Sequence, residues 1–308
     1  MVLLMKLSFL FRLLYSITLL TLLVYMVDLS KMISLIFSMG YKYYILFFIP
    51  FFLSVYFSGT SIYFLLRNNK AQISPREILK FRFLSKSIGL FLPGQLGELS
   101  LVGLLKNKIP MSMTLAVITT DKIISFSIMV FIGITSSLFF FHLPINEVLF
   151  SVLASMMILV PLGFQNVREK IIKHLPKFIR KPFFKYSESL GILYKYKKKA
   201  LFLDIILTLT LLIFASITIK ILLSHLNYSI PLAAIISIQS LSTLSSLLPI
   251  SMGGAGIRES IAVYLLFLLG VPPLISGSMY LTFLFVSYMV AMITLIFSSK
   301  YVTKETFK

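Results

Sequence analysis

The sequence has 308 residues, is 58% hydrophobic and only 13% charged, whereas soluble domains carry about a quarter of charged residues. This composition excludes an ordinary soluble domain, and the absence of cysteine excludes disulfides, thiolate metal sites and cysteine nucleophiles. The net charge of +19 is gathered in loops between apolar runs, chiefly 67–86 and 166–199. We therefore expect anionic membrane lipids, and not nucleic acid, as partners of the basic residues.

Six apolar runs reach the roughly 20 residues that a hydrocarbon core of about 30 Å requires. The predicted spans are 7–27, 43–66, 111–141, 147–165, 200–226 and 274–297. The sequence thus predicts an all-α, polytopic membrane helix bundle. Alternating strand patterns of about ten residues, which are typical of membrane barrels, do not occur.

Two further apolar stretches are broken by proline and glycine. The first, 83–108, contains the motif LPGQLGE, and the second, 231–270, contains LPISMGGAGIRE. Each arm of the first stretch reaches about 18 Å, so we expect a re-entrant hairpin. The second is either a hairpin or two full crossings, which gives six spans plus two hairpins, or eight spans.

The basic loops set the predicted sidedness. With a cytoplasmic amino terminus, loop 28–42 lies outside, whereas 67–86, the basic loop 166–199 and the carboxyl terminus lie in the cytoplasm. Residues 143–308 then repeat residues 1–142 upside down within one integral membrane domain. Such inverted-topology repeats occur in transporters, where broken helices meet near the midplane. We expect the two breaks to face one another in the plasma membrane.

The second break has the composition of an anion site. Its glycines permit close backbone approach; they are Gly253, Gly254 and Gly256. A helix that begins after them exposes free N–H groups, and Arg258 adds a planar fork suited to phosphate. The alternative is that the glycines only let the chain turn or helices pack, while Arg258 pairs with Glu259 or Glu98.

Carboxylates accompany both breaks. Glu98, which follows Gly94 and Gly97, and Glu259 occupy equivalent points of the two halves. They balance Arg258, coordinate a substrate amine or carry a proton; the alternative is a structural salt bridge that fixes the hairpins. We include the two glycines of the first break in the candidate substrate site.

Asp121 and Lys122 lie about 15 Å inside the third predicted span. Adjacent side chains on a helix diverge by about 100°, so these two need other partners. Asp121 is a candidate partner for Arg258 or for a basic residue of the first hairpin.

Four polar residues form one stripe on the first arm of the second broken stretch. They are Gln239, Ser242, Thr243 and Ser246, at spacings i, i+3, i+4 and i+7. The stripe either lines a wet cavity for a headgroup or packs helices together. Arg12, Asp204 and Lys220 lie nearer span ends, where we expect them to snorkel or meet interfacial water.

Signatures of enzymes are missing from the sequence. The three histidines lack metal-ligand spacing, and neither a Walker motif nor a dinucleotide-binding GxGxxG after a strand is present. We therefore expect no catalytic residues, metal or cofactor.

Two motifs resemble those of the lysylphosphatidylglycerol synthase transmembrane-region family, which are flippase-like membrane proteins. They are LPGQLGELS with downstream TTDKI, and LPISMGGAGIRESIAVYLLFLLGVP. The resemblance covers nearly the whole chain; Asp121-Lys122 stands where the family typically carries Glu-Arg. The membrane region of this family is similar to the flippase half of the multiple peptide resistance factor, which moves aminoacylated phosphatidylglycerol between leaflets. No segment here accommodates that protein's soluble aminoacyl-transferase domain, so we expect no lysyltransferase activity.

The resemblance implies a lipid flippase-like transporter for an anionic or aminoacylated phospholipid or a polyprenyl-linked lipid. Arg258 and the helix N-terminus would bind phosphate, while Glu98, Glu259 and Asp121 bind the rest of the headgroup or couple to protons. One alternative is an accessory protein or scaffold for a glycosyltransferase or lipid-modifying enzyme, docked through 166–199. Another is an intramembrane transferase that uses Glu98 or Asp121.

Overall fold

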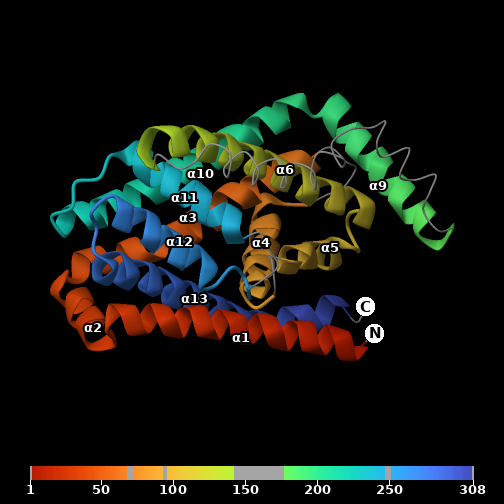
Figure 1. Cartoon of the computed structure of the whole chain (residues 1–308). Helices are drawn as coiled ribbons and strands as arrows, with labels where there is room; N and C mark the ends of the chain where they lie inside the picture. Colours follow the sequence, from red (N-terminus) through yellow and green to blue (C-terminus); the bar gives the residue numbers. More distant parts are fainter. Residues whose placement is uncertain (1, 68–72, 93–95, 142–176, 247–250, 307–308) are drawn as a thin grey trace.

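A computed structural model describes residues 2–67, 73–92, 96–141, 177–246 and 251–306, and almost all of these are helical (Figure 1). The helices are α1 (Val2–Val27), α2 (Leu29–Ser38), α3 (Tyr41–Leu66), α4 (Pro75–Leu90), α5 (Ser100–Leu105), α6 (Met111–Ser136), α9 (Lys177–Tyr196), α10 (Lys198–His225), α11 (Leu232–Ser246), α12 (Ile257–Leu268) and α13 (Pro273–Thr306). A 3₁₀ turn, η1 (Leu96–Leu99), precedes α5, and a π-helical turn, η2 (Ser137–Phe141), follows α6.

Four of these helices, α3, α6, α10 and α13, are long and apolar enough to cross a membrane. A fifth candidate is the pair α1 and α2, which is bent by 70°. Five predicted spans therefore coincide with helices, and the sixth, 147–165, lies outside the described residues. The described chain is an all-α protein with four or five candidate spans, while the predicted total, the repeat and the sidedness stay predictions.

The prediction of a loop at 28–42 is wrong, because most of this segment is the helix α2; its position outside the membrane stays a prediction. Asp28 adopts a φ of 60° and turns the chain. Its carboxylate then accepts a hydrogen bond from the Ser30 N–H at 3.2 Å and caps the new helix. An ion pair between Asp28 and Lys31, at 3.3 Å, holds the same turn.

The predicted basic loop 166–199 is also largely helical where the structure describes it. Helix α9 packs against α6, and its buried side chains include Tyr186, Leu190 and Leu193. They recur every three or four residues, which is the period of an amphipathic helix. The charged residues between them led to the prediction of a loop, although this helical period is present in the sequence.

The second broken segment consists of two short helices. α11 has 15 residues and α12 has 12, which correspond to about 22 and 18 Å. Neither reaches the roughly 30 Å of a hydrocarbon core, so these lengths favour a hairpin over two full crossings. The first broken segment ends in a shorter arm than predicted, since α5 has only six residues.

Two buried apolar clusters hold the helices together. One cluster contains residues of α1, α3, α10, α11, α12 and α13. The other contains residues of α3, α4, α5, α6 and α9. α1 and α13 run side by side in opposite directions along one edge of the molecule, with α9 at the opposite edge (Figure 1). Large apolar side chains also point outward, as do Phe202 and Phe214 of α10 at 64% and 49% exposure. Such a surface suits lipid tails.

Candidate functional site

The two broken segments touch each other. The Gly253 N–H donates a hydrogen bond to the Leu92 carbonyl oxygen, with an N···O distance of 2.9 Å. Gly253 has a φ of 57°, and a Cβ there would lie 2.4 Å from the Leu90 oxygen, so this contact requires glycine. The Tyr288 hydroxyl of α13 donates to the same Leu90 oxygen at 2.9 Å. The two breaks therefore touch, as predicted, while their insertion from opposite sides of the membrane stays a prediction.

The first break holds η1 tightly against α4. A Cβ on Gly97 would lie 2.3 Å from the Gly89 Cα atom, so only a hydrogen atom fits between the two backbones. This approach places the next residue, Glu98, under α4 with only 6% of its surface exposed. Gly94, the other candidate glycine of this break, lies outside the described residues.

Glu98 binds two cations from different helices. Its Oε2 lies 3.0 Å from Arg82 Nη1 of α4 and 2.7 Å from Lys122 Nζ of α6. Arg82 Nε in turn donates to Ser58 Oγ of α3 at 2.9 Å. We call Ser58, Arg82, Glu98 and Lys122 the Glu98 cluster. The structural alternative for Glu98, an ion pair that fixes the hairpin, is therefore present.

Arg82 was missed by the sequence analysis, which counted it only as one basic residue of loop 67–86. It is 2% exposed, and the face it shares with Ile78, Ser85 and Gly89 is buried as well. The i, i+4, i+7, i+11 spacing of this face was readable in the sequence. An arginine on such a face needs a buried carboxylate, and Glu98 supplies it.

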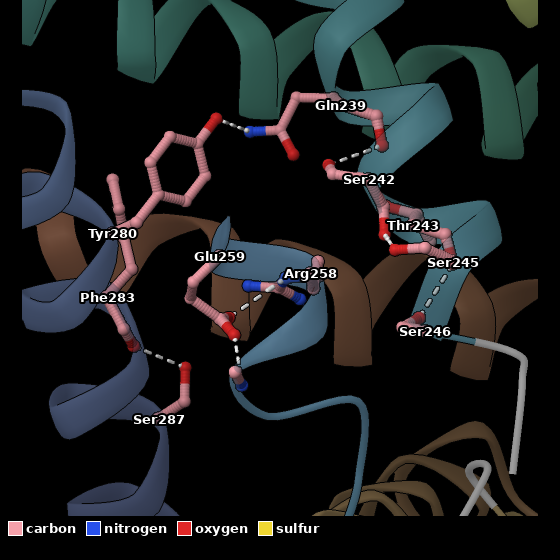
Figure 2. A network of polar contacts seen from close by, with 11 residues as sticks. Gln239, Ser242, Thr243, Ser245, Ser246, Arg258, Glu259, Tyr280, Phe283 and Ser287 are labelled. Carbon is pink, nitrogen blue, oxygen red and sulfur yellow. Dashed lines mark hydrogen bonds and ion pairs between the residues drawn. The ribbon is translucent and has the colours of Figure 1, made fainter. Parts of the chain in front are cut away.

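Arg258 and Glu259 occupy the first turn of α12, between α13 and the polar face of α11 (Figure 2). Glu259 is 1% exposed, and its Oε2 accepts a hydrogen bond from the Gly256 N–H at 2.8 Å. Its Oε1 lies 3.3 Å from Arg258 Nε. Glu259 thus caps the helix and orients Arg258, whose side chain stays 38% exposed. The side chain is therefore partly exposed, although its Nε atom is buried and lacks a hydrogen-bond partner.

The glycines of the second break each meet a different helix. Gly253 contacts α4, as described above. A Cβ on Gly254 would lie 2.5 Å from the Ser246 Cβ of α11, and one on Gly256 would lie 2.8 Å from the Leu19 Cβ of α1. Close packing therefore explains these glycines, as the structural alternative expected.

Helix α1 makes a polar contact with the second break as well. The Met252 N–H donates to Ser16 Oγ at 2.8 Å, and both residues are buried. The backbone of the break is therefore fixed from the amino-terminal end of the chain.

The polar stripe of α11 faces the start of α12 and the helix α13 (Figure 2). Gln239 Nε2 donates to the Tyr280 hydroxyl oxygen at 3.4 Å. Ser242 and Ser246 are buried and donate to carbonyl oxygens of their own helix, those of Gln239 and Thr243. The Ser242 hydroxyl oxygen keeps acceptor capacity, whereas its donor is already used.

Lys86 of α4 adds a further cation between the breaks. It is attracted electrostatically by Glu98 and repelled by Arg82, Lys122 and Arg258. Within the described part of the chain, no carboxylate forms an ion pair with Lys86. Because Glu98 is already shared by two cations, Lys86 is left without an ion pair of its own.

Asp121 does not pair with Arg258, one of its two predicted partners. Lys86 of the first hairpin, and Arg82 just before it, act on Asp121 electrostatically but form no ion pair with it. Asp204 was predicted near interfacial water, and this is wrong, because its exposed fraction is 0%. Among the described residues, no group of three or more His, Asp or Glu side chains is placed to hold a metal ion.

The chain matches the family described as Lysylphosphatidylglycerol synthase TM region over residues 9–294. Comparison with curated proteins and with solved structures gave no match. The family match covers nearly the whole chain and agrees with an apolar, all-α architecture, as a membrane protein of lipid metabolism or transport requires. The chain therefore belongs to the lysylphosphatidylglycerol synthase transmembrane-region family.

Proposed function

We propose that this protein is a flippase-like transporter, which moves a lipid with an anionic or aminoacylated headgroup, or a polyprenyl-linked lipid, between the leaflets of the plasma membrane. The observation that carries the proposal is the contact of the two breaks beside a partly exposed arginine side chain. Gly253 touches Leu92, and Arg258 stands five residues further on, at the start of α12.

The charges support a phosphate-bearing ligand. Arg258 offers a planar pair of donors at a helix N-terminus, where the backbone dipole also favours an anion. Lys86 adds positive charge that no carboxylate in the described chain pairs with. A lipid phosphate between the two side chains would give Lys86 an ion-pair partner. The acceptors of the α11 stripe suit an amine or hydroxyl of the same headgroup.

The helix lengths support movement across the membrane. Half-length helices that meet inside an apolar slab are typical of transporters, because irregular backbone is tolerated there only against protein or a wet cavity. We expect transport without chemical conversion of the lipid. The enzyme that makes the lipid is the expected partner.

The test is a leaflet-exchange assay with the purified protein in liposomes of phosphatidylglycerol and phosphatidylcholine. A fluorescent phosphatidylglycerol is quenched from outside, and the quenched fraction is followed with time. Wild type should expose inner-leaflet probe, Arg258→Ala should reduce the rate about tenfold or more, and Arg258→Lys should retain part of it because lysine keeps the charge without the fork.

The matched control is Arg76→Ala, which removes an exposed arginine from the start of α4. It should leave the rate unchanged. If Arg258→Ala and Arg76→Ala move the probe equally fast, then Arg258 does not bind the headgroup.

A further inference from the structure

A second polar group lies between α3, α6 and α10, apart from the residues proposed to bind the lipid. Asp204 of α10 is fully buried, and neither carboxylate oxygen has a hydrogen-bond partner. Ser61 of α3 is 1% exposed, and its Oγ is also without a partner. Buried polar atoms are nearly always satisfied, so these orphaned atoms on two helices indicate a missing ligand.

Asp121 of α6 completes the group. It is 4% exposed. Asp121 and Ser61 both act directly on the Asp204 carboxyl group, although neither meets hydrogen-bond geometry with it. Two carboxylates this close do not both stay ionised, because like charges repel strongly where water is excluded.

We propose that Asp121 and Asp204 bind one exchangeable proton between their carboxyl groups, and that this proton drives the lipid movement proposed above. The shared proton makes one carboxyl group a donor, while the other stays an acceptor. The Ser61 hydroxyl donates to the oxygen that keeps the charge. Both Asp204 oxygens and Ser61 Oγ then have partners. The proposal about coupling rests on the proposed function.

The surrounding charges leave room for a single proton. Lys122 of α6 and Arg82 of α4 both attract the pair. Lys86 of α4 also attracts Asp121, whereas Glu98 repels it. Lys122 and Arg82 are committed to Glu98, so they offset only part of the negative charge of the pair. α11 carries no ionisable side chain, and the charged residues of α9 are not among the groups that act most strongly on Asp204.

Two of the three members, Asp204 and Ser61, lie close to one end of their helices. Asp204 is six residues from Lys198 at the start of α10, and Ser61 is five residues from Leu66 at the end of α3. These separations correspond to about 9 and 8 Å. Lys197 donates to the Arg67 carbonyl oxygen at this same end. A proton therefore has a short path from the basic surface.

The Glu98 cluster connects the proton site to the breaks. Arg82 and Lys122 feel the carboxyl pair and also hold Glu98, which follows the first break. When a proton removes one negative charge, these two cations are attracted more strongly to Glu98. The first break contacts the second at Gly253. A shift of Glu98 on protonation of the pair would therefore be transmitted to the lipid site through packed groups.

Infrared difference spectra of the full-length protein in liposomes, recorded between acidic and alkaline pH, test the proton site without any transport. We expect a protonated-carboxyl band that vanishes in Asp204→Asn and in Asp121→Asn. It should persist in Asp28→Asn, which alters an exposed carboxyl group, and in Asp204→Glu. A band that survives in Asp204→Asn, or that is missing from wild type, overturns the proposal.

Transport tests the coupling. A gradient of one pH unit should shift the equilibrium leaflet ratio of the fluorescent lipid by about tenfold for one coupled proton. The ratio should ignore the gradient in Asp204→Asn. A wild-type ratio that ignores the pH gradient, or that follows a sodium gradient at fixed pH, overturns the coupling. If wild type moves no lipid, the proposed function fails, and the infrared band still decides the proton site.

Discussion

Replacing Glu98 by glutamine should destabilise the fold more than removing either of its cations. Glutamine keeps the shape of the side chain but removes the charge that both Arg82 and Lys122 share. Arg82, only 2% exposed, would then be a buried cation without a carboxylate. Removing one partner of a buried ion pair costs about 3–5 kcal/mol. We expect the lower part of this range, because the amide oxygen and Ser58 still accept hydrogen bonds.

Removing each of the two cations should lower the stability by a different amount. Arg82→Gln leaves Glu98 paired with Lys122, so it should cost less than Glu98→Gln. The Lys122 side chain is 31% exposed, so its loss should cost about 0–1 kcal/mol, as for a surface pair. The double variant Arg82→Gln/Glu98→Gln should be more stable than Glu98→Gln alone, since no orphaned guanidinium remains.

The measurement is unfolding of the purified protein in mixed micelles, with helix content followed by circular dichroism as the fraction of denaturing detergent rises. The expected order of destabilisation is Glu98→Gln, then Arg82→Gln, then Lys122→Gln. Equal stability of Glu98→Gln and wild type, or a loss in Lys122→Gln as large as in Glu98→Gln, would refute the reasoning from burial.

Two further predictions use the same unfolding assay. Gly97→Ala should cost about 1–3 kcal/mol, because its Cβ would meet the Gly89 backbone at 2.3 Å; Gly103→Ala, with no atom within 4 Å of the new Cβ, should instead gain up to about 1 kcal/mol. A stable Gly97→Ala would show that η1 is not held by this contact. Glu259→Gln keeps an acceptor for the N–H at the start of α12 but loses its charge at the helix N-terminus, so it should cost about 0.3–1 kcal/mol; no change would mean that Arg258 alone fixes the turn.

The breaks were predictable from the sequence because proline and glycine interrupt helices by local geometry alone. LPGQLGE and LPISMGGAGIRE mark where α4 and α11 end, and no partner is needed to infer this. The direct contact of the breaks followed from the expected topology. The roles of the neighbouring residues did not follow. Glu259, predicted as a ligand group or an ion pair, is also the cap of its own helix.

The burial of Asp204 and Arg82 could not be predicted from their positions in the sequence. Counting residues from a span end gives depth along the helix axis, and for Asp204 that depth was close to the surface. Exposure depends instead on which neighbour covers that side of the helix, and α3 and α6 cover it here. Arg82 was assigned by charge to a loop, although its helical face was buried. Both errors arise because tertiary neighbours override local pattern.

The contact between α1 and the second break has a consequence for biosynthesis. The hydrogen bond from Met252 to Ser16 joins positions 236 residues apart. A ribosome releases Ser16 long before Met252 exists, so the first helix must wait in the bilayer with this surface uncovered until the last quarter of the polypeptide emerges. Closure of so distant a contact is slow. The hydrogen bond between the glycine turn and the first helix therefore forms late in assembly.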